Sequence, residues 1–201
     1  MSEAELTLTR TSQAAEGNSK SLLGFWVYLM TDCVLFASLF ATFVVLKGNT
    51  FGGPDGEIIF KLPFVLAETL ILLTSSFVCG LGLLAARSGQ QKRVLVCFGL
   101  TFLLGAAFLT LELTEFRHLV MEGDSWRRSG FLSAFFTLVG THGLHITIGL
   151  FWMINMMRQV GSRGLTTPVV RRLTMLAMFW HFLDIIWIFI FTIVYLMGIA
   201  G

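Results

Sequence analysis

Charged residues are scarce in this sequence: they make up 13% of its 201 residues, against the roughly 25% that is usual in soluble domains. The 14 basic and 12 acidic side chains stand in short blocks between long apolar runs, and hydrophobic residues make up 55% of the chain. No basic stripe with interleaved aromatic residues is present, which argues against a nucleic-acid partner. The pattern is typical of a protein that crosses a membrane several times.

Cysteine is also rare, and the beginning of the chain lacks a targeting signal. The three cysteines, Cys33, Cys79 and Cys97, are odd in number, form no C-x-x-C pair and lie in or beside apolar runs. No disulfide framework is therefore predicted, and we interpret them as small packing residues. Residues 1–23 lack the basic start, apolar stretch and cleavage site of a signal peptide, so we expect a soluble cytoplasmic tail.

Five apolar runs are long enough to span a bilayer: residues 24–46, 62–86, 94–119, 131–157 and 173–199. Each exceeds the about 20 residues that cross the hydrocarbon core as a helix. A helix satisfies its own backbone hydrogen bonds, which an isolated strand in lipid cannot do. The sequence therefore predicts an all-α integral membrane protein, with a five-transmembrane-helix bundle over residues 24–201.

Lysine and arginine are unevenly divided among the segments that flank these runs. The tail and the second and fourth connections hold Arg10, Lys20, Arg87, Lys92, Arg93, Arg158, Arg163, Arg171 and Arg172. The first and third connections hold only Lys47, Lys61, Arg127 and Arg128. Because basic residues accumulate in cytoplasmic loops, we expect a cytoplasmic N-terminus and a periplasmic C-terminus.

Ionisable side chains inside the runs are costly in lipid and are functional candidates by default. They are Asp32, Glu68, Glu112, Glu115, His118, His142, His145, His181 and Asp184. The helical rise places the three glutamates and His118 in an outer polar layer and the other five in a deeper layer, about 10 Å away. Steps of three residues put the members on each helix on a shared face.

Three interpretations of these layers stay open. Interhelical hydrogen bonds that hold the bundle together are favoured. A metal site built from the deeper layer would instead make the chain a self-sufficient membrane oxidase or metal carrier, although the predicted depth excludes the glutamates from it. Proton handling by Asp32 or the histidines, as in a small transporter, is the third. No catalytic, cofactor-binding or metal-ligating residue is assigned.

Three local strings resemble the signatures of a known family. They read Thr31-Asp32-Cys33-Val34-Leu35-Phe36, Gly140-Thr141-His142-Gly143-Leu144-His145 and Trp180-His181-Phe182-Leu183-Asp184-Ile185-Ile186-Trp187. They are similar to subunit III of the haem-copper terminal oxidases, and the resemblance covers residues 24–198. Five helices with a Thr-Asp-Cys string are most similar to the cytochrome bo type of ubiquinol oxidase. Five-helix oxidases that use menaquinol or cytochrome c stay open.

The resemblance implies a non-catalytic subunit of a proton-pumping respiratory ubiquinol oxidase in a bacterial inner membrane. In that family subunit I carries the two haems and the copper, so no cofactor is expected in this chain. The implied partners are subunit I, subunit II and a small subunit IV, with ubiquinol as the substrate of the complex. The implied role is to stabilise subunit I and to bind phospholipid. Asp32 stands where the family has a glutamate that faces a lipid-filled cleft, and we expect it to lie there.

Overall fold

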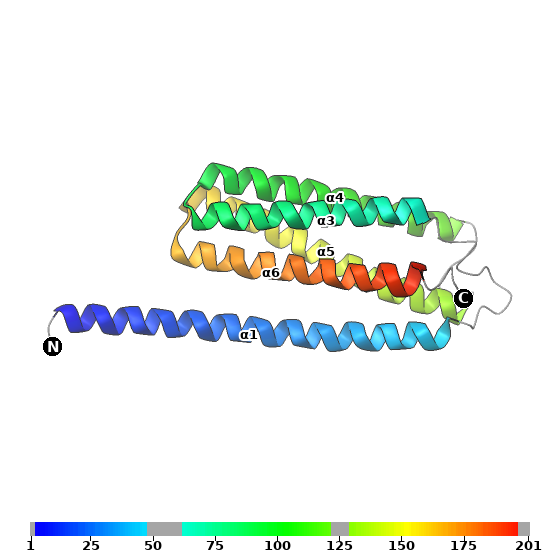
Figure 1. Ribbon diagram of the computed structural model, residues 1–201, viewed down its shortest axis with the longest axis horizontal. Helices are drawn as coiled ribbons and strands as arrows, with labels where there is room; N and C mark the ends of the chain where they lie inside the picture. The colour runs from blue at the N-terminus through cyan, green and yellow to red at the C-terminus, as the bar shows by residue number, and fades with distance from the viewer. Residues whose placement is uncertain (1–2, 48–61, 122–128, 197–201) are drawn as a thin grey trace. The chain divides into compact units, whose positions relative to one another are not determined.

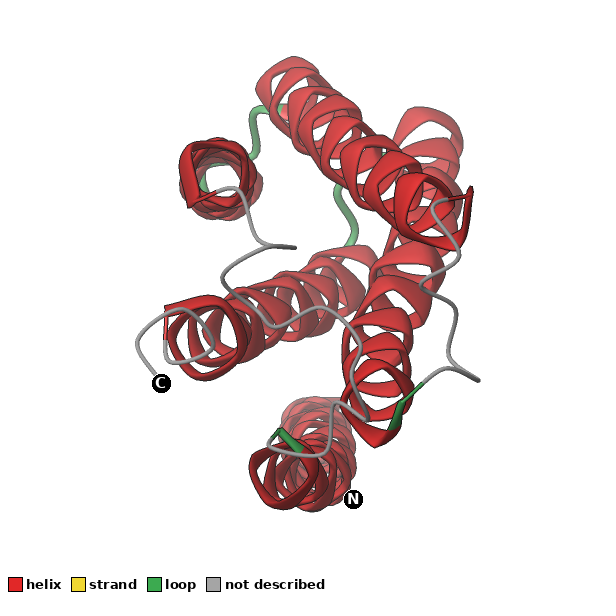
Figure 2. Cartoon of the chain, turned by 90° about the vertical axis from the view of Figure 1, so that its right-hand side faces the viewer, coloured by secondary structure: helices red, strands yellow, loops and turns green. Residues whose placement is uncertain are grey.

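The computed structural model describes residues 3–47, 62–121 and 129–196, and within these ranges the regular structure is helical (Figures 1 and 2). The elements are α1 (Glu3–Leu46), α3 (Leu62–Arg87), α4 (Gln91–Met121), α5 (Gly130–Arg163), α6 (Thr167–Ile190) and the π-helix η1 (Phe191–Leu196). The chain divides into two compact units, residues 1–35 and 36–201. The first unit is the beginning of α1, and the second holds the end of α1 and all later elements.

Five helical stretches are long and apolar enough to cross a membrane: Lys20–Leu46, Pro63–Arg87, Gln91–Met121, Gly130–Arg163 and Thr167–Leu196. The predicted all-α fold with five spans is therefore confirmed. The helices extend beyond the predicted apolar runs, because polar residues at helix ends continue the backbone hydrogen bonds without being apolar. The connection predicted for residues 158–172 shrinks to residues 164–166, and the tail predicted for residues 1–23 is helical from Glu3.

Helices α3 to α6 of the second unit form a closed ring in which α3 and α5 each pack against α4 and α6 (Figure 1). Consecutive helices run antiparallel and are joined at one end by tight turns, residues 88–90 and 164–166. Each turn contains a glycine with positive φ, Gly89 at 71° and Gly164 at 68°, a conformation that side chains with a Cβ rarely adopt. The Gln91 side chain donates from Nε2 to the Val160 carbonyl at 2.8 Å and so ties the two turns together.

Trp180 of α6 fills the centre of this ring. Its indole ring lies against Gly105 of α4 and Gly149 of α5, where an added Cβ would meet ring atoms at 2.8 Å and 3.0 Å. Close approach at small residues replaces the hydrophobic driving force that lipid does not supply between helices. The two glycines therefore make room for the largest side chain of the core.

Candidate functional site

Indole and imidazole groups of α6 form hydrogen bonds with hydroxyl groups of α3 in a ladder between the two helices, called here the α3–α6 ladder. Trp180 Nε1 donates to Ser75 Oγ at 3.1 Å, and Trp187 Nε1 donates to Thr69 Oγ1 at 3.0 Å. His181 Nδ1 is hydrogen-bonded to Ser76 Oγ. Because α3 and α6 are antiparallel, Trp187, which is later on α6 than Trp180, meets Thr69, which is earlier on α3 than Ser75. The ladder fixes the register of α6 against α3.

Ser75 also connects the ladder to a third helix. Its hydroxyl donates to the Thr101 carbonyl of α4 at 3.3 Å while it accepts from Trp180, and Ser75 is fully buried. A single hydroxyl thus bonds to two neighbouring helices. Thr101 Oγ1 in turn lies 2.9 Å from the carbonyl of Cys97 in its own helix.

Ser75→Ala is expected to lower the free energy of unfolding by about 0.6–1.7 kcal/mol, the range measured for interhelical hydrogen bonds in membranes. The Trp180 N–H is left without its acceptor inside the ring. Unfolding of the purified chain in mixed detergent micelles, followed by circular dichroism, measures the change. Thr74→Ala is the matched control, because the exposed Thr74 hydroxyl bonds only within α3, to the Leu70 carbonyl. Equal stability of the two variants would contradict the role of the ladder.

His181 and Asp184, both predicted for the deeper layer, lie together on α6. His181 Nδ1 is 4.0 Å from Asp184 Oδ2, and Asp184 is buried while His181 is partly exposed. Ser76 of α3 completes this group through its bond to His181. A histidine beside a carboxyl group can exchange protons, but the same contacts also serve as interhelical links.

The three predicted glutamates come together as a carboxyl cluster, defined here as Glu68, Glu112 and Glu115. Glu68 on α3 and Glu112 on α4 are buried, Glu115 is half-buried, and the three groups interact electrostatically. The Tyr195 hydroxyl of η1 donates to Glu115 Oε2 at 3.5 Å. No hydrogen bond from any described residue reaches the carboxyl oxygens of Glu68 or Glu112. Three of the four members of the predicted outer layer, the glutamates, therefore lie near one another.

Glu112 lies closer to the middle of α5 than the predicted depth difference between the two layers suggests. Glu112 Oε2 lies 3.7 Å from the position of a Cβ built on Gly143, the neighbour of His142. The estimate of about 10 Å counted only the helical rise. It ignored that helical side chains point back toward the N-terminus of their helix, so the glutamate carboxyl reaches from α4 toward the middle of α5. Glu112 of the outer layer thus lies beside the backbone of α5, one residue after His142 in the chain.

His142 sits in an aromatic cage. Its ring stacks on Trp187 with centroids 5.3 Å apart and meets Phe108 and Phe36 edge-on at 6.2 Å and 6.4 Å. The residue has no exposed surface, and neither ring nitrogen has a hydrogen bond within the described chain. His145, one turn later, is half-buried and its Nδ1 bonds to the Thr141 carbonyl of the same helix at 2.8 Å. The cage holds His142 by packing.

His142→Phe is expected to leave the free energy of unfolding unchanged or to raise it by about 1–3 kcal/mol, because it removes two buried nitrogens that lack hydrogen bonds and keeps the stacked ring. Detergent unfolding of the purified chain measures the stability. Turnover of the protein in its native assembly is the second measurement. Preserved stability with preserved turnover assigns His142 to packing. Preserved stability with reduced turnover would give the imidazole a chemical role and contradict this interpretation.

The remaining candidates lie elsewhere, and the described residues do not assemble a metal site. Asp32 lies on α1 in the unit of residues 1–35, and His118 is exposed near the end of α4. No group of three or more His, Cys, Asp or Glu side chains in the described ranges is arranged to hold a metal ion. The alternative metal site of the deeper layer thus gains no support from the geometry.

The sequence interpretation missed the partners of these groups. Thr69 and Ser76 are seven residues apart and so share one face of an apolar helix, a signal that was available, and Ser75 lies about 100° around the helix from Ser76. The signal is weak, because such hydroxyls also bond within their own helix, as Thr69 does to the Val65 carbonyl at 2.8 Å. Tyr195 was missed because an uninterrupted α-helix would direct it elsewhere.

Comparison with known proteins adds to this geometry. Residues 2–199 match the family described as cytochrome c oxidase subunit III. The chain is 55% identical over 185 residues to cytochrome bo(3) ubiquinol oxidase subunit 3 of Pseudomonas aeruginosa, an alignment that covers 92% of this chain and 88% of that protein. It is 46% identical over 187 residues to quinol oxidase subunit 3 of Bacillus subtilis, covering 93% and 92%. It is 46% identical over 186 residues to cytochrome c oxidase subunit 3 of Bacillus sp. PS3, covering 92% and 89%.

Proposed function

Because the chain belongs to the cytochrome c oxidase subunit III family, we propose that it is the non-catalytic third subunit of a proton-pumping respiratory ubiquinol oxidase. The observation that carries this proposal is the 55% identity to a bo(3) ubiquinol oxidase subunit 3 over 92% of the chain. The complex oxidises quinol, reduces dioxygen to water and moves protons across a bacterial inner membrane.

The arrangement of polar groups supports a structural role. The α3–α6 ladder joins side chains of this chain to one another, and the His142 cage surrounds its ring with side chains of the same chain. Large apolar side chains instead point outward from the ring, such as Phe77 and Leu103, which are 68% and 64% exposed. Such surfaces suit contact with lipid and with apolar faces of other subunits. The proposed role is to stabilise the catalytic subunit and to bind phospholipid.

The proposed partners follow from the family. Subunit I carries two haems and one copper, subunit II lies alongside, and a small subunit IV completes the complex. The proposed orientation places the N-terminus and the two tight turns in the cytoplasm, where the basic residues accumulate. We propose that Asp32, whose side chain is buried, lies at a lipid-filled cleft, and that the other seven candidates serve the internal scaffold: Glu68, Glu112, Glu115, His142, His145, His181 and Asp184.

Purification of the tagged chain from the native membrane in mild detergent tests the proposal. We expect a large haem-bearing subunit to co-purify, a reduced-minus-oxidised haem spectrum, and dioxygen consumption on addition of ubiquinol. Recovery of the chain alone with a stoichiometric metal ion would reverse the proposal and make the deeper-layer residues an active site.

One observation favours cytochrome c, in place of ubiquinol, as the electron donor of the complex. The chain is 46% identical to a protein named cytochrome c oxidase subunit 3. The same preparation separates the two donors when it is supplied with ubiquinol or with reduced cytochrome c. Turnover with cytochrome c alone would transfer the proposal to that class of oxidase.

A further inference from the structure

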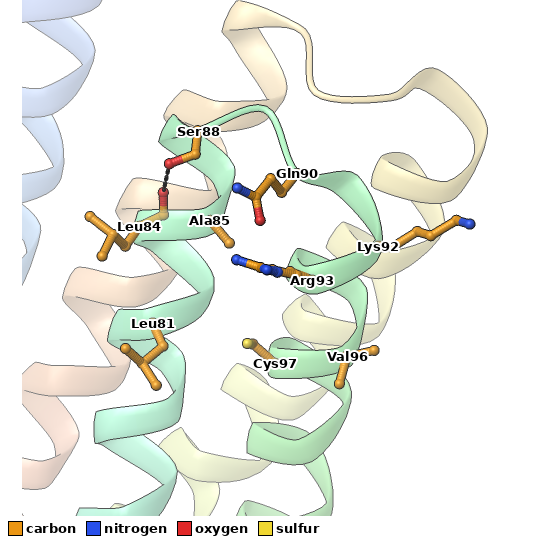
Figure 3. Close-up of a pocket in the computed structure, with 9 residues that line it drawn as sticks. All are labelled: Leu81, Leu84, Ala85, Ser88, Gln90, Lys92, Arg93, Val96 and Cys97. Atoms are coloured by element: carbon orange, nitrogen blue, oxygen red, sulfur yellow. Dashed lines mark hydrogen bonds between the residues drawn. The ribbon is translucent and has the colours of Figure 1, made fainter.

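A groove runs between α3 and α4 beside the turn of residues 88–90, with a volume of about 450 Å³ (Figure 3). Its walls are mostly apolar: Leu81 and Leu84 come from α3, and Val96 and Cys97 from α4. Leu84 and Val96 are exposed on the outer side of the helix pair. Both helices span the membrane, so this groove opens to the lipid that surrounds the protein.

Cationic and polar side chains occupy the end of the groove next to the turn. Arg93 extends from α4 toward α3, Lys92 extends outward from the same helical turn, and Gln90 lies close to Arg93 (Figure 3). Ser88 lines the same end and donates to the Leu84 carbonyl at 3.1 Å. Neither Lys92 nor Arg93 forms an ion pair with an acidic residue in the described parts of the chain. Two positive charges thus lie at one end of the apolar groove, and no carboxylate of the described residues forms an ion pair with them.

We propose that this groove binds an anionic phospholipid, with its phosphate at Arg93, the positive charge of Lys92 nearby at the same end, and an acyl chain along Leu81, Leu84 and Val96. Charge complementarity carries the choice of lipid, because basic pockets between membrane helices attract anionic head groups. The planar guanidinium of Arg93 suits a phosphate, to which it can donate two parallel hydrogen bonds. The apolar wall continues from the head group into the hydrocarbon region, as a single chain of a phospholipid requires.

The inference deepens the lipid-binding part of the proposed function by naming a site and a lipid class. A zwitterionic phospholipid fits the apolar wall equally well, but it has no net charge to offset the two cations. Under the proposed orientation the bound lipid belongs to the cytoplasmic leaflet. The site is distinct from the position of Asp32, which lies on another helix.

The test uses the intact, purified complex that contains this subunit. After delipidation, photoactivatable phosphatidylglycerol or phosphatidylcholine is added in detergent, crosslinked and mapped by mass spectrometry of peptides that cover residues 81–97. We expect phosphatidylglycerol to crosslink there at lower concentration than phosphatidylcholine. The double variant Lys92→Gln with Arg93→Gln should weaken phosphatidylglycerol about fivefold for each cation removed, about 25-fold in all, and leave phosphatidylcholine unchanged. Raised salt should shrink the preference.

Two control variants sharpen the outcome. Arg163→Gln removes an exposed cation at the end of α5, on the same side of the ring but outside the groove, and should not change the crosslinking. Leu84→Trp should fill the apolar part of the groove and reduce crosslinking of both lipids, while Lys92 and Arg93 stay in place. Because Leu84 and Arg163 are exposed, as Lys92 and Arg93 are, all of these variants are expected to fold.

Equal crosslinking of the two lipids, or an undiminished preference in the double variant, overturns the proposal. An equally large loss of phosphatidylglycerol crosslinking in Arg163→Gln and in the double variant also overturns it. The preference would then come from the overall positive charge of that membrane face and not from the groove. Crosslinking of a neighbouring subunit to residues 81–97 in place of lipid would assign the groove to a partner helix and also overturn it. The haem content of each preparation is recorded separately, so failure of the oxidase role and failure of the lipid site are told apart.

Discussion

Trp187→Ala is expected to lower the free energy of unfolding by about 3–5 kcal/mol, the usual cost of truncating a buried tryptophan. Trp187 is 1% exposed, and its indole ring packs edge-on against Phe108 with centroids 4.6 Å apart. It also forms the base on which His142 stacks, and it donates the hydrogen bond to Thr69. The substitution therefore has three effects at once. It opens a cavity, removes one hydrogen bond of the α3–α6 ladder, and removes the ring on which His142 stacks.

The measurement is the unfolding free energy of the purified chain in mixed micelles, with the yield of assembled complex as a second readout. Ile185→Ala is the matched control on the same helix, because Ile185 is 54% exposed and its truncation leaves no internal cavity. Trp187→Phe should lose less, since it keeps an aromatic ring beside Phe108 and His142 but removes the bond to Thr69. A loss below about 1 kcal/mol for Trp187→Ala would contradict the assigned packing.

Gly105→Ala is expected to destabilise the chain by about 1–3 kcal/mol through overpacking. An added Cβ would lie 2.8 Å from two ring atoms of Trp180 and 3.2 Å from a methyl carbon of Leu150. Trp180 cannot withdraw easily, because it is buried, it bonds to Ser75, and its ring also lies against Gly149. The rigid ring gives the new methyl group no room.

Gly99→Ala is the control for helix propensity on the same helix. Nothing lies within 4 Å of a Cβ at Gly99, so this variant should be neutral or slightly more stable. The double variant Gly105→Ala with Trp180→Phe should show coupling. Its loss of unfolding free energy should be smaller than the sum of the two single losses, because the smaller ring leaves room for the added methyl group. Additive losses would show that the glycine does not act through the tryptophan.

The fold followed from the sequence because hydropathy over about 20 residues is a strong physical signal. Helix ends did not follow as well. Residues such as Gln91 and Arg163 are polar, yet they lie within helices whose backbone hydrogen bonds do not depend on side-chain polarity. Local periodicity likewise identified the shared faces of Glu112 with Glu115 and of His181 with Asp184.

Contacts between helices could not be predicted to the same degree, since they depend on tilt and on the direction of each side chain. Rise along the axis alone separated Glu112 from the His142 region, although the carboxyl group lies against Gly143. The hydrogen bond between Ser75 and Trp180 could not be predicted, because the two residues are 105 positions apart and meet only when α3 packs against α6. The π-helix has no distinctive composition, and only the packing of Tyr195 against Glu115 and Trp187 reveals its effect.

The π-helix links the number of residues ahead of Tyr195 to the direction in which the tyrosine side chain points. Each backbone hydrogen bond of a π-helix spans one more residue than in an α-helix, so six π-helical residues turn about as far about the axis as five α-helical residues. Removing one residue from this segment, 191–196, ahead of Tyr195 would therefore restore an α-helix and leave the tyrosine facing Glu115, whereas an α-helix of unchanged length would turn it by about 100° about the axis, away from Glu115. Among relatives, a one-residue gap at this place should therefore be compatible with a tyrosine at the matching position, because the shorter α-helix directs the hydroxyl to the same carboxyl group.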